Sequence, residues 1–431
     1  MAESTNKKHL VIIGGGFGGL NLAKRVDKSR WQVVLVDRNN YHSFPPLFYQ
    51  VASSGLEPAS ISFPFRRELN GRNYEGCSFR MGTVETIDVN AKTVRTQYET
   101  IPYDKLVIAA GSTNNFFGIE NLEKTVFTLK STTEAIRARN EVLDRLERAA
   151  IIPDKNKRAH LLTFVVVGGG PAGVEIAGAL GEMKRYVIKR EYLSIDPDEV
   201  KVVLVEGADV LLQAMGPKAA EDALLGLRQL LVDVQLGKVM KSYKDGVVTF
   251  GDGSELRTDT VIWTAGVVGV SFKFEGAQPV MERGQRFKVD NNCKVEGLED
   301  VYAIGDIAYM TTPAYPSGHP QVAQVALQQG ACLAGNLSSP EGHELPFVYH
   351  DKGSMATIGR NRAVANVGKM YLSGRVAWWA WLVVHLLSIL GMRNRTVVFI
   401  NWMWNYFNFS AGLRLLLRPD RYPLRHYWSE E

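Results

Sequence analysis

The sequence predicts an α/β fold with two similar parallel-sheet domains, the first interrupted by the second, and a C-terminal region of different composition. Three observations support this prediction. A glycine-rich turn follows an apolar run twice, each half of the chain repeats a second apolar run at similar spacing, and tryptophan and arginine accumulate after residue 346. A chain of 431 residues is also long enough for two or three domains.

The first glycine-rich turn predicts a dinucleotide-binding site. An apolar run at residues 9–13 leads into the pattern G-x-G-x-x-G at Gly14, Gly16 and Gly19, and a predicted helix follows. In this pattern the first glycine permits the tight turn, the second lets the backbone approach a pyrophosphate, and the third lets the helix pack on the strand. The next predicted strand ends in Asp37, where a carboxylate can bind a ribose hydroxyl.

The second glycine-rich turn shows the same order of features. The predicted strand 161–167 precedes Gly168, Gly170 and Gly173, and a later strand ends in Glu206. The gap between the glycines and the acid is longer than usual because extra helix and a polar turn are inserted. A carboxylate at Glu206 would repel the 2′-phosphate of NADPH, so the sequence predicts a preference for NADH.

The spacing of a second pair of glycines supports two domains of similar size. Gly111 lies 95 positions after Gly16, and Gly266 lies 96 positions after Gly170. A further predicted strand ends in Asp306, as expected if a later segment returns to the first sheet. An aspartate at that strand end can hold a ribityl hydroxyl or a phosphate-bridging water, although Gly-Asp is also a common turn.

Composition disfavours several classes of function. Cys77, Cys293 and Cys332 are far apart and form no C-x-x-C, so we expect no dithiol, no disulfide framework and no metal site. The net charge of +5 suits an anionic membrane surface or a phosphate-bearing ligand and is too small to indicate nucleic acid. The N-terminal residues contain no apolar or arginine-rich leader, so no signal or transit peptide is expected.

The series GGGFGG with Asp37, AAGS, GGGPAGVE with Glu206, TAG and YAIGD resembles the two-dinucleotide flavoprotein disulfide reductase superfamily over residues 8–345. The resemblance implies FAD on the first, discontinuous domain and NAD(P)H on the inserted domain. Members of this superfamily that act through paired cysteines, including sulfide:quinone reductases, do not fit the cysteine pattern of the chain.

Three further features resemble type II (non-proton-pumping) NADH:quinone oxidoreductases. Residues 40–55 resemble the flavin-contacting loop of that family, and A-Q-x-A-x-Q at residues 323–328 matches its quinone-site motif. Gln324 and Gln328 lie four residues apart on one helix face, so their amides can donate to a quinone carbonyl. The alternative is a polar helix face that caps the flavin pocket. The resemblance also implies that Glu175 points toward the nicotinamide and the flavin, and so positions the nicotinamide.

This second resemblance implies a domain order and a reaction. The FAD-binding domain would comprise residues 1–125 and 269–345, the NADH-binding domain residues 126–268, and the membrane-anchoring region residues 346–431. Hydride would pass from the co-substrate NADH to FAD, and two electrons would then pass to a membrane quinone without proton pumping.

Two alternatives stay open on the sequence alone. A soluble NAD(P)H-dependent flavoprotein reductase, of ferredoxin-reductase or apoptosis-inducing-factor-like type, would share the first 345 residues and end in a compact α/β interface domain. A scaffold protein of the same fold would have lost turnover, but the intact glycine turns with Glu206 and Asp306 argue against it.

The C-terminal region predicts attachment to a membrane. Residues 376–392 carry no charge, and no acidic residue lies between Asp351 and Asp420. Tryptophan and arginine suit the headgroup level of an anionic membrane. As a helix the uncharged run would be about 26 Å long, near the lower limit for a membrane span. Taken alone, the run would fit a short span or a buried helix as well as an interfacial one. The tryptophans and arginines around it favour the interface, and the resemblance implies monotopic attachment, so residues 376–417 are predicted to form a peripheral, monotopic anchor on the cytoplasmic face of the cell inner membrane. The basic residues placed to meet anionic lipids are Arg375, Arg393, Arg395, Arg414 and Arg418.

Two smaller questions concern the same region. Lys369 either helps to deliver protons to a reduced quinone or is an ordinary solvated lysine. The apolar C-terminal run is also compatible with a homodimer.

Overall fold

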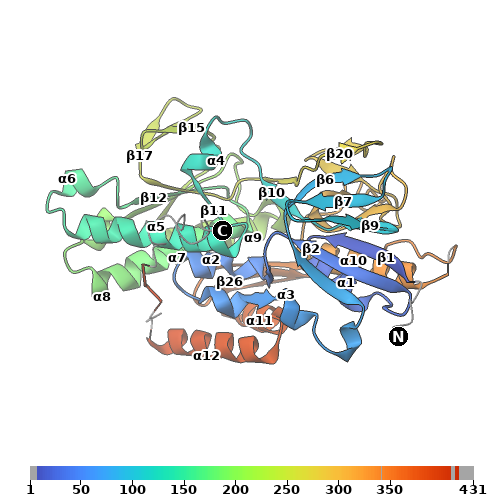
Figure 1. Cartoon of the computed structure of the whole chain (residues 1–431). Coiled ribbons are helices and arrows are strands. Elements are labelled where there is room, and N and C mark those ends of the chain that lie inside the picture. Colours follow the sequence, from blue (N-terminus) through green and yellow to red (C-terminus); the bar gives the residue numbers. More distant parts are fainter. Residues whose placement is uncertain (1–6, 341, 409–412, 417–431) are drawn as a thin grey trace, which may run out of the picture. The chain divides into compact units, whose positions relative to one another are not determined.

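The structure, a computed structural model, describes residues 7–340, 342–408 and 413–416 (Figure 1). Contacts between residues divide the chain into two compact units. The first unit contains Met1–Phe44, Ser62–Asn115 and Gly266–Gly353, and the second contains Pro45–Ile61, Phe116–Ala265 and Ser354–Glu431.

The first unit is built on a five-stranded parallel sheet. Its strand order is β23-β9-β1-β2-β5, and every neighbouring pair is parallel. The strands are apolar and mostly buried, as is usual when both faces of a sheet are covered. Because β23 pairs with β9, the late segment that ends in Asp306 does return to the first sheet. The sheet strands are β1 Lys8–Ile13, β2 Trp31–Asp37, β5 Cys77–Met81, β9 Lys105–Ile108 and β23 Val301–Ala303.

Helices α1 (Phe17–Arg25) and α10 (Ala323–Ser338) pack against each other in this unit. The smaller elements of the first unit are β3 Tyr41–Ser43, β4 Ser62–Pro64, α3 Phe65–Glu68, η3 Arg72–Tyr74, β6 Val84–Asp88, β7 Thr93–Thr96, β8 Thr100–Pro102, β10 Ser112–Asn114, β19 Val267–Gly269, β20 Phe274–Glu275, β21 Met281–Glu282, β22 Arg286–Lys288, η7 Gly305–Ile307 and β24 Ala308–Tyr309.

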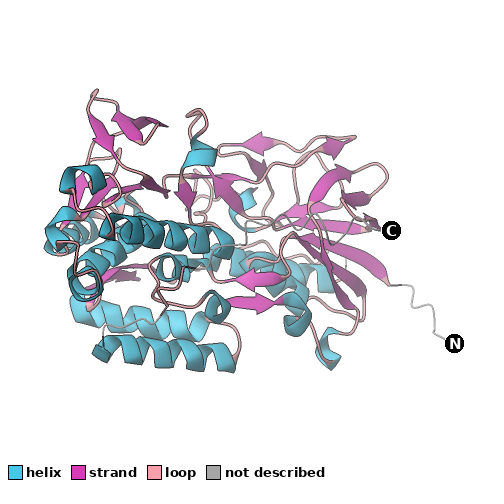
Figure 2. Cartoon of the chain, turned by 60° about the vertical axis from the view of Figure 1, so that its left-hand side comes forward, coloured by secondary structure: helices cyan, strands magenta, loops and turns pink. Residues whose placement is uncertain are grey.

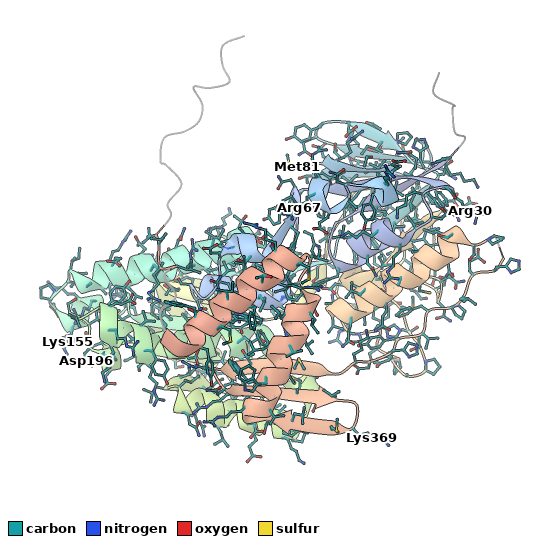
Figure 3. The ribbon with its side chains drawn as sticks, turned by 90° about the horizontal axis from the view of Figure 1, so that it is seen from below. Arg30, Arg67, Met81, Lys155, Asp196 and Lys369 are labelled. Carbon is teal, nitrogen blue, oxygen red and sulfur yellow. The ribbon has the colours of Figure 1, made fainter. Side chains whose placement is uncertain are left out.

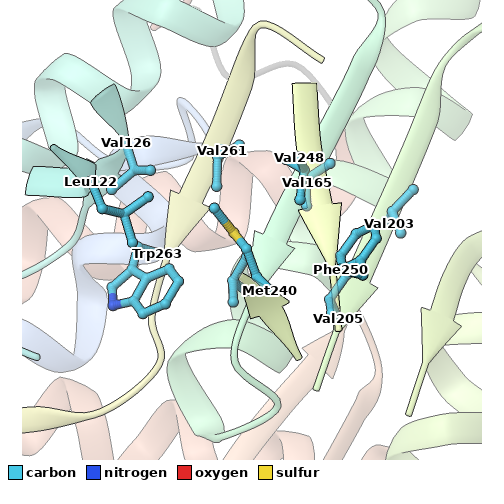
Figure 4. Packing of buried hydrophobic residues seen from close by; sticks show 11 residues of the cluster. Leu122, Val126, Val165, Val203, Val205, Met240, Val248, Phe250, Val261 and Trp263 are labelled. Carbon is cyan, nitrogen blue, oxygen red and sulfur yellow. The ribbon is translucent and has the colours of Figure 1, made fainter. Parts of the chain in front are cut away.

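The second unit repeats the parallel sheet. Its order is β11-β18-β12-β13-β14, and the buried residues of these strands form a core with Met240 and Phe250 from a neighbouring hairpin (Figure 4). The central strand again precedes a glycine-rich turn and a helix, so the prediction of two similar domains is confirmed. The strands are β11 Phe127–Thr128, β12 Thr163–Val167, β13 Lys201–Val205, β14 Val232–Gln235 and β18 Thr260–Trp263.

The helix after the second glycine turn explains the long gap before Glu206. Helix α7 (Pro171–Glu182) continues as a π-helical segment, η4 (Met183–Ile188), and then as α8 (Lys189–Glu191). The other elements of this unit up to residue 353 are η1 Pro45–Leu47, α2 Phe48–Ala52, η2 Pro58–Ile61, α4 Leu122–Thr125, α5 Thr132–Ala150, α6 Lys155–Arg158, η5 Pro197–Glu199, η6 Gln213–Met215, α9 Pro217–Gln229, β15 Met240–Lys244, β16 Val247–Phe250 and β17 Glu255–Arg257.

The C-terminal region begins with an antiparallel meander of β25 (Ser354–Gly359), β26 (Arg362–Val367) and β27 (Met370–Ser373). Helices α11 (Gly374–Ser388) and α12 (Met392–Asn408) follow and lie beside each other (Figures 2 and 3). The uncharged run 376–392 is therefore not one continuous helix. The first helix ends at Ser388, and the second begins at Met392. Among the described helices, none is both long and apolar enough to cross a membrane.

The contact-based units divide the chain differently from the predicted domains. The boundaries fall after Asn115 and Ala265, where the sequence predicted 125 and 268. Residues 45–61 belong to the second unit because α2 packs on α5 and α7. The C-terminal region also belongs to the second unit, since β25 packs along α7.

Candidate functional site

The first glycine turn has the geometry of a phosphate-binding loop. Gly14 has a φ of +99°, which favours glycine, and a Cβ at Gly19 would overlap the carbonyl oxygen of Gly14. A Cβ at Gly16 would meet no atom within 4 Å, so the backbone there is open to a ligand. The turn is held by Asp37, whose Oδ2 accepts the N–H of Gly15 at 2.7 Å. Burial raises the pKa of Asp37, and the Gly15 N–H opposes that rise.

Two further predicted residues meet this turn in the first unit. Gly111 follows β9, the strand beside β1, and is open on the side where a Cβ would point. Ser112 Oγ donates to Asp306 Oδ2 at 2.7 Å, which places Asp306 beside Gly111 at the carboxyl end of the sheet. This edge of the sheet fits a dinucleotide such as FAD, because it combines an open glycine turn with one carboxylate after β2 and a second after β23.

The second glycine turn repeats the first in detail. Gly168 has a φ of +112°, a Cβ at Gly173 would overlap the carbonyl oxygen of Gly168, and a Cβ at Gly170 would meet nothing within 4 Å. Glu206 Oε2 accepts the Gly169 N–H, as Asp37 does for Gly15. Gly266 follows β18 on the neighbouring strand, so each unit brings its predicted glycines and acid to one edge of its sheet.

Glu175 lies in the second unit, near the start of α7, and is buried. Its Oε1 accepts the backbone N–H of Thr357 at 3.3 Å. Burial raises the pKa of Glu175 to about 8, and the Thr357 N–H opposes the rise, so the carboxyl is mainly protonated at pH 7. Helix and strand approach this closely because residue 178 is glycine: a Cβ there would overlap the carbonyl oxygen of Ile358.

A chain of hydrogen bonds runs from Thr357 to the C-terminal helices. Tyr49 OH lies 3.1 Å from Thr357 Oγ1 and accepts from Gln50 Nε2 at 2.9 Å. The other end of the Gln50 amide, Oε1, accepts from Trp402 Nε1 at 2.8 Å. Polar groups from α2, β25 and α12 are therefore fixed next to the buried carboxyl of Glu175.

These residues line a cavity of about 210 Å³ within the second unit. Its walls combine polar side chains with aromatic side chains from α11 and α12, and with Ala179 of α7 and Met183 and Val187 of η4. The lining residues include Tyr49, Gln50, Glu175, Thr357, Trp378, Trp381 and Trp402. Such a mixture suits a flat aromatic ligand with polar groups at one end and an apolar tail.

Gln324 and Gln328, predicted to bind a quinone, lie in the first unit on α10. Gln324 Nε2 donates to Gly353 O at 2.9 Å and its Oε1 accepts the Lys352 N–H at 2.9 Å. Gln328 forms the same pair of bonds with the backbone of His350, at 2.8 and 2.9 Å. In this structure both amides thus hold the segment that leads into β25, and their contact with a quinone stays a prediction.

Lys369 lies in the turn between β26 and β27 and is exposed (Figure 3). Its position at the end of this hairpin supports the solvated-lysine interpretation. Arg414, predicted to meet lipid, is instead paired with Glu191. Arg418 lies outside the described residues.

The polar residues of the cavity other than Glu175 were missed by sequence reasoning. Tyr49 and Gln50 lie within the flavin-loop motif of residues 40–55, which was the available signal. Thr357 and Trp402 had no signal, because a threonine in a strand and a tryptophan in an apolar helix are ordinary core residues.

Comparison with known proteins gives matches over nearly the whole chain. A family model described as pyridine nucleotide-disulphide oxidoreductase matches residues 8–330, and one described as NDH2 C-terminal domain matches residues 351–408. The chain is 33% identical over 429 residues to the type II NADH:quinone oxidoreductase Ndh of Mycobacterium tuberculosis, covering 95% of this chain and 90% of that protein.

Two further similarities extend to eukaryotes. The chain is 30% identical to an internal alternative NAD(P)H-ubiquinone oxidoreductase A1, mitochondrial, of Arabidopsis thaliana, covering 93% of this chain and 84% of that protein. Among solved structures, NDH2 from Plasmodium falciparum in complex with NADH has a TM-score of 0.88 at 21% identity. That comparison covers 96% of this chain and 100% of the other, and it shows a common fold.

Proposed function

Because this chain belongs to the type II NADH:quinone oxidoreductase family, it oxidises NADH and reduces a quinone, and we propose which residues hold each reactant. The observation that carries the assignment is a match that covers 95% of the chain, including its C-terminal region. A soluble reductase would end in an α/β interface domain, so that alternative is set aside.

FAD, the cofactor of this family, would be held in the first unit by the turn at Gly14, Gly16 and Gly19, with Asp37 and Asp306 at the neighbouring strand ends. When bound, FAD accepts a hydride from NADH and passes two electrons to the quinone, without proton pumping. The protein contributes the open backbone at Gly16 and the two carboxylates, which accept hydrogen bonds from ribose and ribityl hydroxyls.

NADH would be held in the second unit by the turn at Gly168, Gly170 and Gly173, with its pyrophosphate at the N-terminus of α7. Glu206 would accept hydrogen bonds from the adenosine ribose, and Gly266 leaves room beside the turn. The carboxylate of Glu206 would also produce a preference for NADH, since it would lie against the 2′-phosphate of NADPH.

The quinone ring would enter the cavity beside Glu175, with its tail among the aromatic side chains of α11 and α12. A reduced quinone must take up two protons. A carboxyl that burial keeps protonated at pH 7 is suited to donate one of them, with the hydroxyl of Tyr49 3.1 Å from Thr357 Oγ1 to complete the polar end. This proposal gives Glu175 a role at the acceptor in addition to the predicted positioning of nicotinamide.

The outer faces of α11 and α12 would contact the membrane. Their inner faces are buried in the second unit through Ala377, Trp381, Ile389 and Val398. The large apolar side chains that remain exposed on these helices are Val376, Trp379, Val383, Val384, Leu387, Met392, Phe399, Ile400, Met403 and Trp404. Contiguous exposed apolar surface of this kind marks an interaction site, and tryptophan suits the headgroup level.

We place this face on the cytoplasmic leaflet of the inner membrane, because NADH is a cytoplasmic reductant and the quinone is dissolved in the bilayer. Attachment would be peripheral. A homodimer is a separate proposal, to be checked by the mass of the detergent-solubilised protein.

A direct test of the function is the choice of acceptor. The purified, FAD-loaded protein should oxidise NADH rapidly with a short-chain quinone and slowly with a one-electron protein carrier of the ferredoxin type. Rapid turnover with the carrier and none with quinone would contradict the proposal.

Replacing Glu206 with glutamine should reduce the preference for NADH over NADPH by roughly tenfold, because removing one charge repulsion is worth about 1.4 kcal/mol. The measurement is the ratio of kcat/KM for the two nucleotides with one quinone. Asp233→Asn, which removes an exposed carboxylate on the neighbouring strand β14, is a matched control. Equal efficiency of NADH and NADPH in the unchanged protein would contradict the assignment of Glu206.

Replacing Gln324 with alanine or Gln328 with leucine should slow quinone reduction several-fold and leave flavin reduction by NADH nearly unchanged. A hydrogen bond from a neutral amide is worth about 1 kcal/mol. The same several-fold loss of quinone reduction is expected if the amides contact the quinone and if they only hold residues 350–353. Quinone affinity and thermal stability distinguish these two roles. A changed quinone KM with an unchanged thermal midpoint indicates contact, and a lowered midpoint indicates a holding role.

A further inference from the structure

A second cavity of about 360 Å³ lies in the second unit and adjoins the proposed quinone cavity, since Glu182, Tyr186 and Arg360 line both. It is formed by the turn between β25 and β26, the π-helical segment η4 and the start of α11. Four arginines and one carboxylate line it, together with a tyrosine, an asparagine and a leucine: Arg185, Arg360, Arg362, Arg375, Glu182, Tyr186, Asn361 and Leu230.

Among the described residues, few acidic groups balance the charge of this cavity. Arg185, Arg362 and Arg375 form no ion pair with any described residue. The single carboxyl, Glu182, accepts the backbone N–H of Arg360; burial raises its pKa, and that N–H together with the charges of Arg360 and Arg362 opposes the rise. Four arginines and one carboxyl therefore line the cavity.

One guanidinium nitrogen in the cavity wall lacks a partner. Arg362 Nη1 is buried and has no hydrogen-bond partner within the described part of the chain. A buried cationic donor without an acceptor is unfavourable, and a guanidinium matches the oxygens of a phosphate group with two parallel hydrogen bonds. The cavity therefore offers what a phosphate group requires.

We propose that this arginine cavity binds a phosphate group, and that the group is the headgroup phosphate of an anionic phospholipid. Arg375, on the rim, is followed directly by Val376, which is 65% exposed and begins the apolar face of α11. A lipid with its phosphate at Arg362 and Arg375 could lay its acyl chains along that face. The phosphate site follows from the cavity itself, whereas its lipid source rests on the proposed membrane placement of α11 and α12.

The test uses the FAD-loaded full chain and three probes: dihexanoyl phosphatidylglycerol below its micelle concentration, dihexanoyl phosphatidylcholine and inorganic phosphate. Isothermal titration calorimetry should show one site for phosphatidylglycerol, tighter than for either other probe. Arg362→Gln and Arg375→Gln should each weaken this binding by about tenfold or more, equal to roughly 1.4 kcal/mol. Arg137→Gln, which removes an exposed arginine of α5 outside the cavity, should change it less than twofold.

Arg375 is exposed, so its variant should fold even if the Arg362 variant does not. Absent binding of phosphatidylglycerol, or equal weakening by Arg137→Gln, would overturn the phosphate site. Inorganic phosphate that binds as tightly as phosphatidylglycerol would overturn the lipid source. Attachment to vesicles of pure phosphatidylcholine reports on the membrane anchor separately: its loss would contradict the anchor and leave the cavity assignment standing.

Discussion

Replacing Glu175 with glutamine should slow quinone reduction by about 100-fold, the typical contribution of a general acid, and leave flavin reduction by NADH within a few-fold of its original rate. Glutamine keeps an oxygen that can accept the Thr357 N–H, so the packing of α7 on β25 should be preserved. The measurement is stopped-flow absorbance of the flavin, with NADH mixed first and quinone second. Slowing of the NADH step by the same factor would instead assign Glu175 to the nicotinamide alone.

The pH dependence gives the same variant a second readout. Burial raises the pKa of Glu175 from 4.5 to about 8, so the rate of quinone reduction should be highest well below pH 8 and should decrease above it. The glutamine variant should not show this decrease.

The same shift predicts how stability depends on pH. Between pH 4.5 and about 8 the folded state binds more protons than the unfolded state. Stability should therefore decline as pH rises from about 4.5 to 8, and less steeply in Glu175→Gln. An identical slope of thermal midpoint against pH in both proteins would contradict the shifted pKa.

Replacing Leu387 and Ile400 together with glutamate should release the protein from membranes and leave its fold intact. These side chains are 62% and 57% exposed, one on each helix. Inserting such a side chain into an apolar phase is worth roughly 1.5 kcal/mol or more, so the pair should lower membrane partitioning by at least about 100-fold. Leu193→Glu with Leu225→Glu, at exposed apolar positions outside α11 and α12, is the matched control.

The comparison is made by sedimentation with liposomes. The double variant should keep NADH oxidation with a water-soluble acceptor and lose most activity with a long-tail quinone. Release of the unchanged protein by high salt alone would show that electrostatic attraction, not apolar insertion, carries the attachment. Deleting the chain after Tyr371 is a poorer experiment, because it removes Trp381, which is 1% exposed and belongs to the folded core.

The dinucleotide turns could be predicted because their requirements are local. Gly14 and Gly168 need a positive φ, and Asp37 and Glu206 each hold the next glycine N–H of their own turn. The return of a late strand to the first sheet was also predicted, because an apolar run that ends in Asp306 follows the two glycine turns, and β23 does pair with β9.

The partners of Gln324 and Gln328 could not be predicted. Their spacing places both amides on one face of α10, but it does not specify what that face meets. The structure places the backbone of residues 350–353 there. The cavity proposed for the quinone could not be predicted either, because its residues come from distant parts of the sequence. Tyr49 and Thr357, for example, are 308 residues apart.

Helices α11 and α12 carry apolar residues both on their buried side and on their exposed side. A helix that buries one side in protein and exposes an apolar other side is apolar all round. Trp381 points into the second unit and Leu387 is exposed, although both lie on α11. The packing of α11 against β26, β25 and β27 determines which side of the helix is buried.

The most direct test of the proposed acceptor site is photolabelling with an azidoquinone, followed by mapping of the labelled peptides. The FAD-loaded protein should be labelled in residues 49–55, in residues 357–359 and in residues 378–382, which line the cavity beside Glu175. Excess unlabelled quinone should abolish that labelling, and NADH alone should not. Labelling confined to residues 323–328, with none in the cavity, would contradict the account.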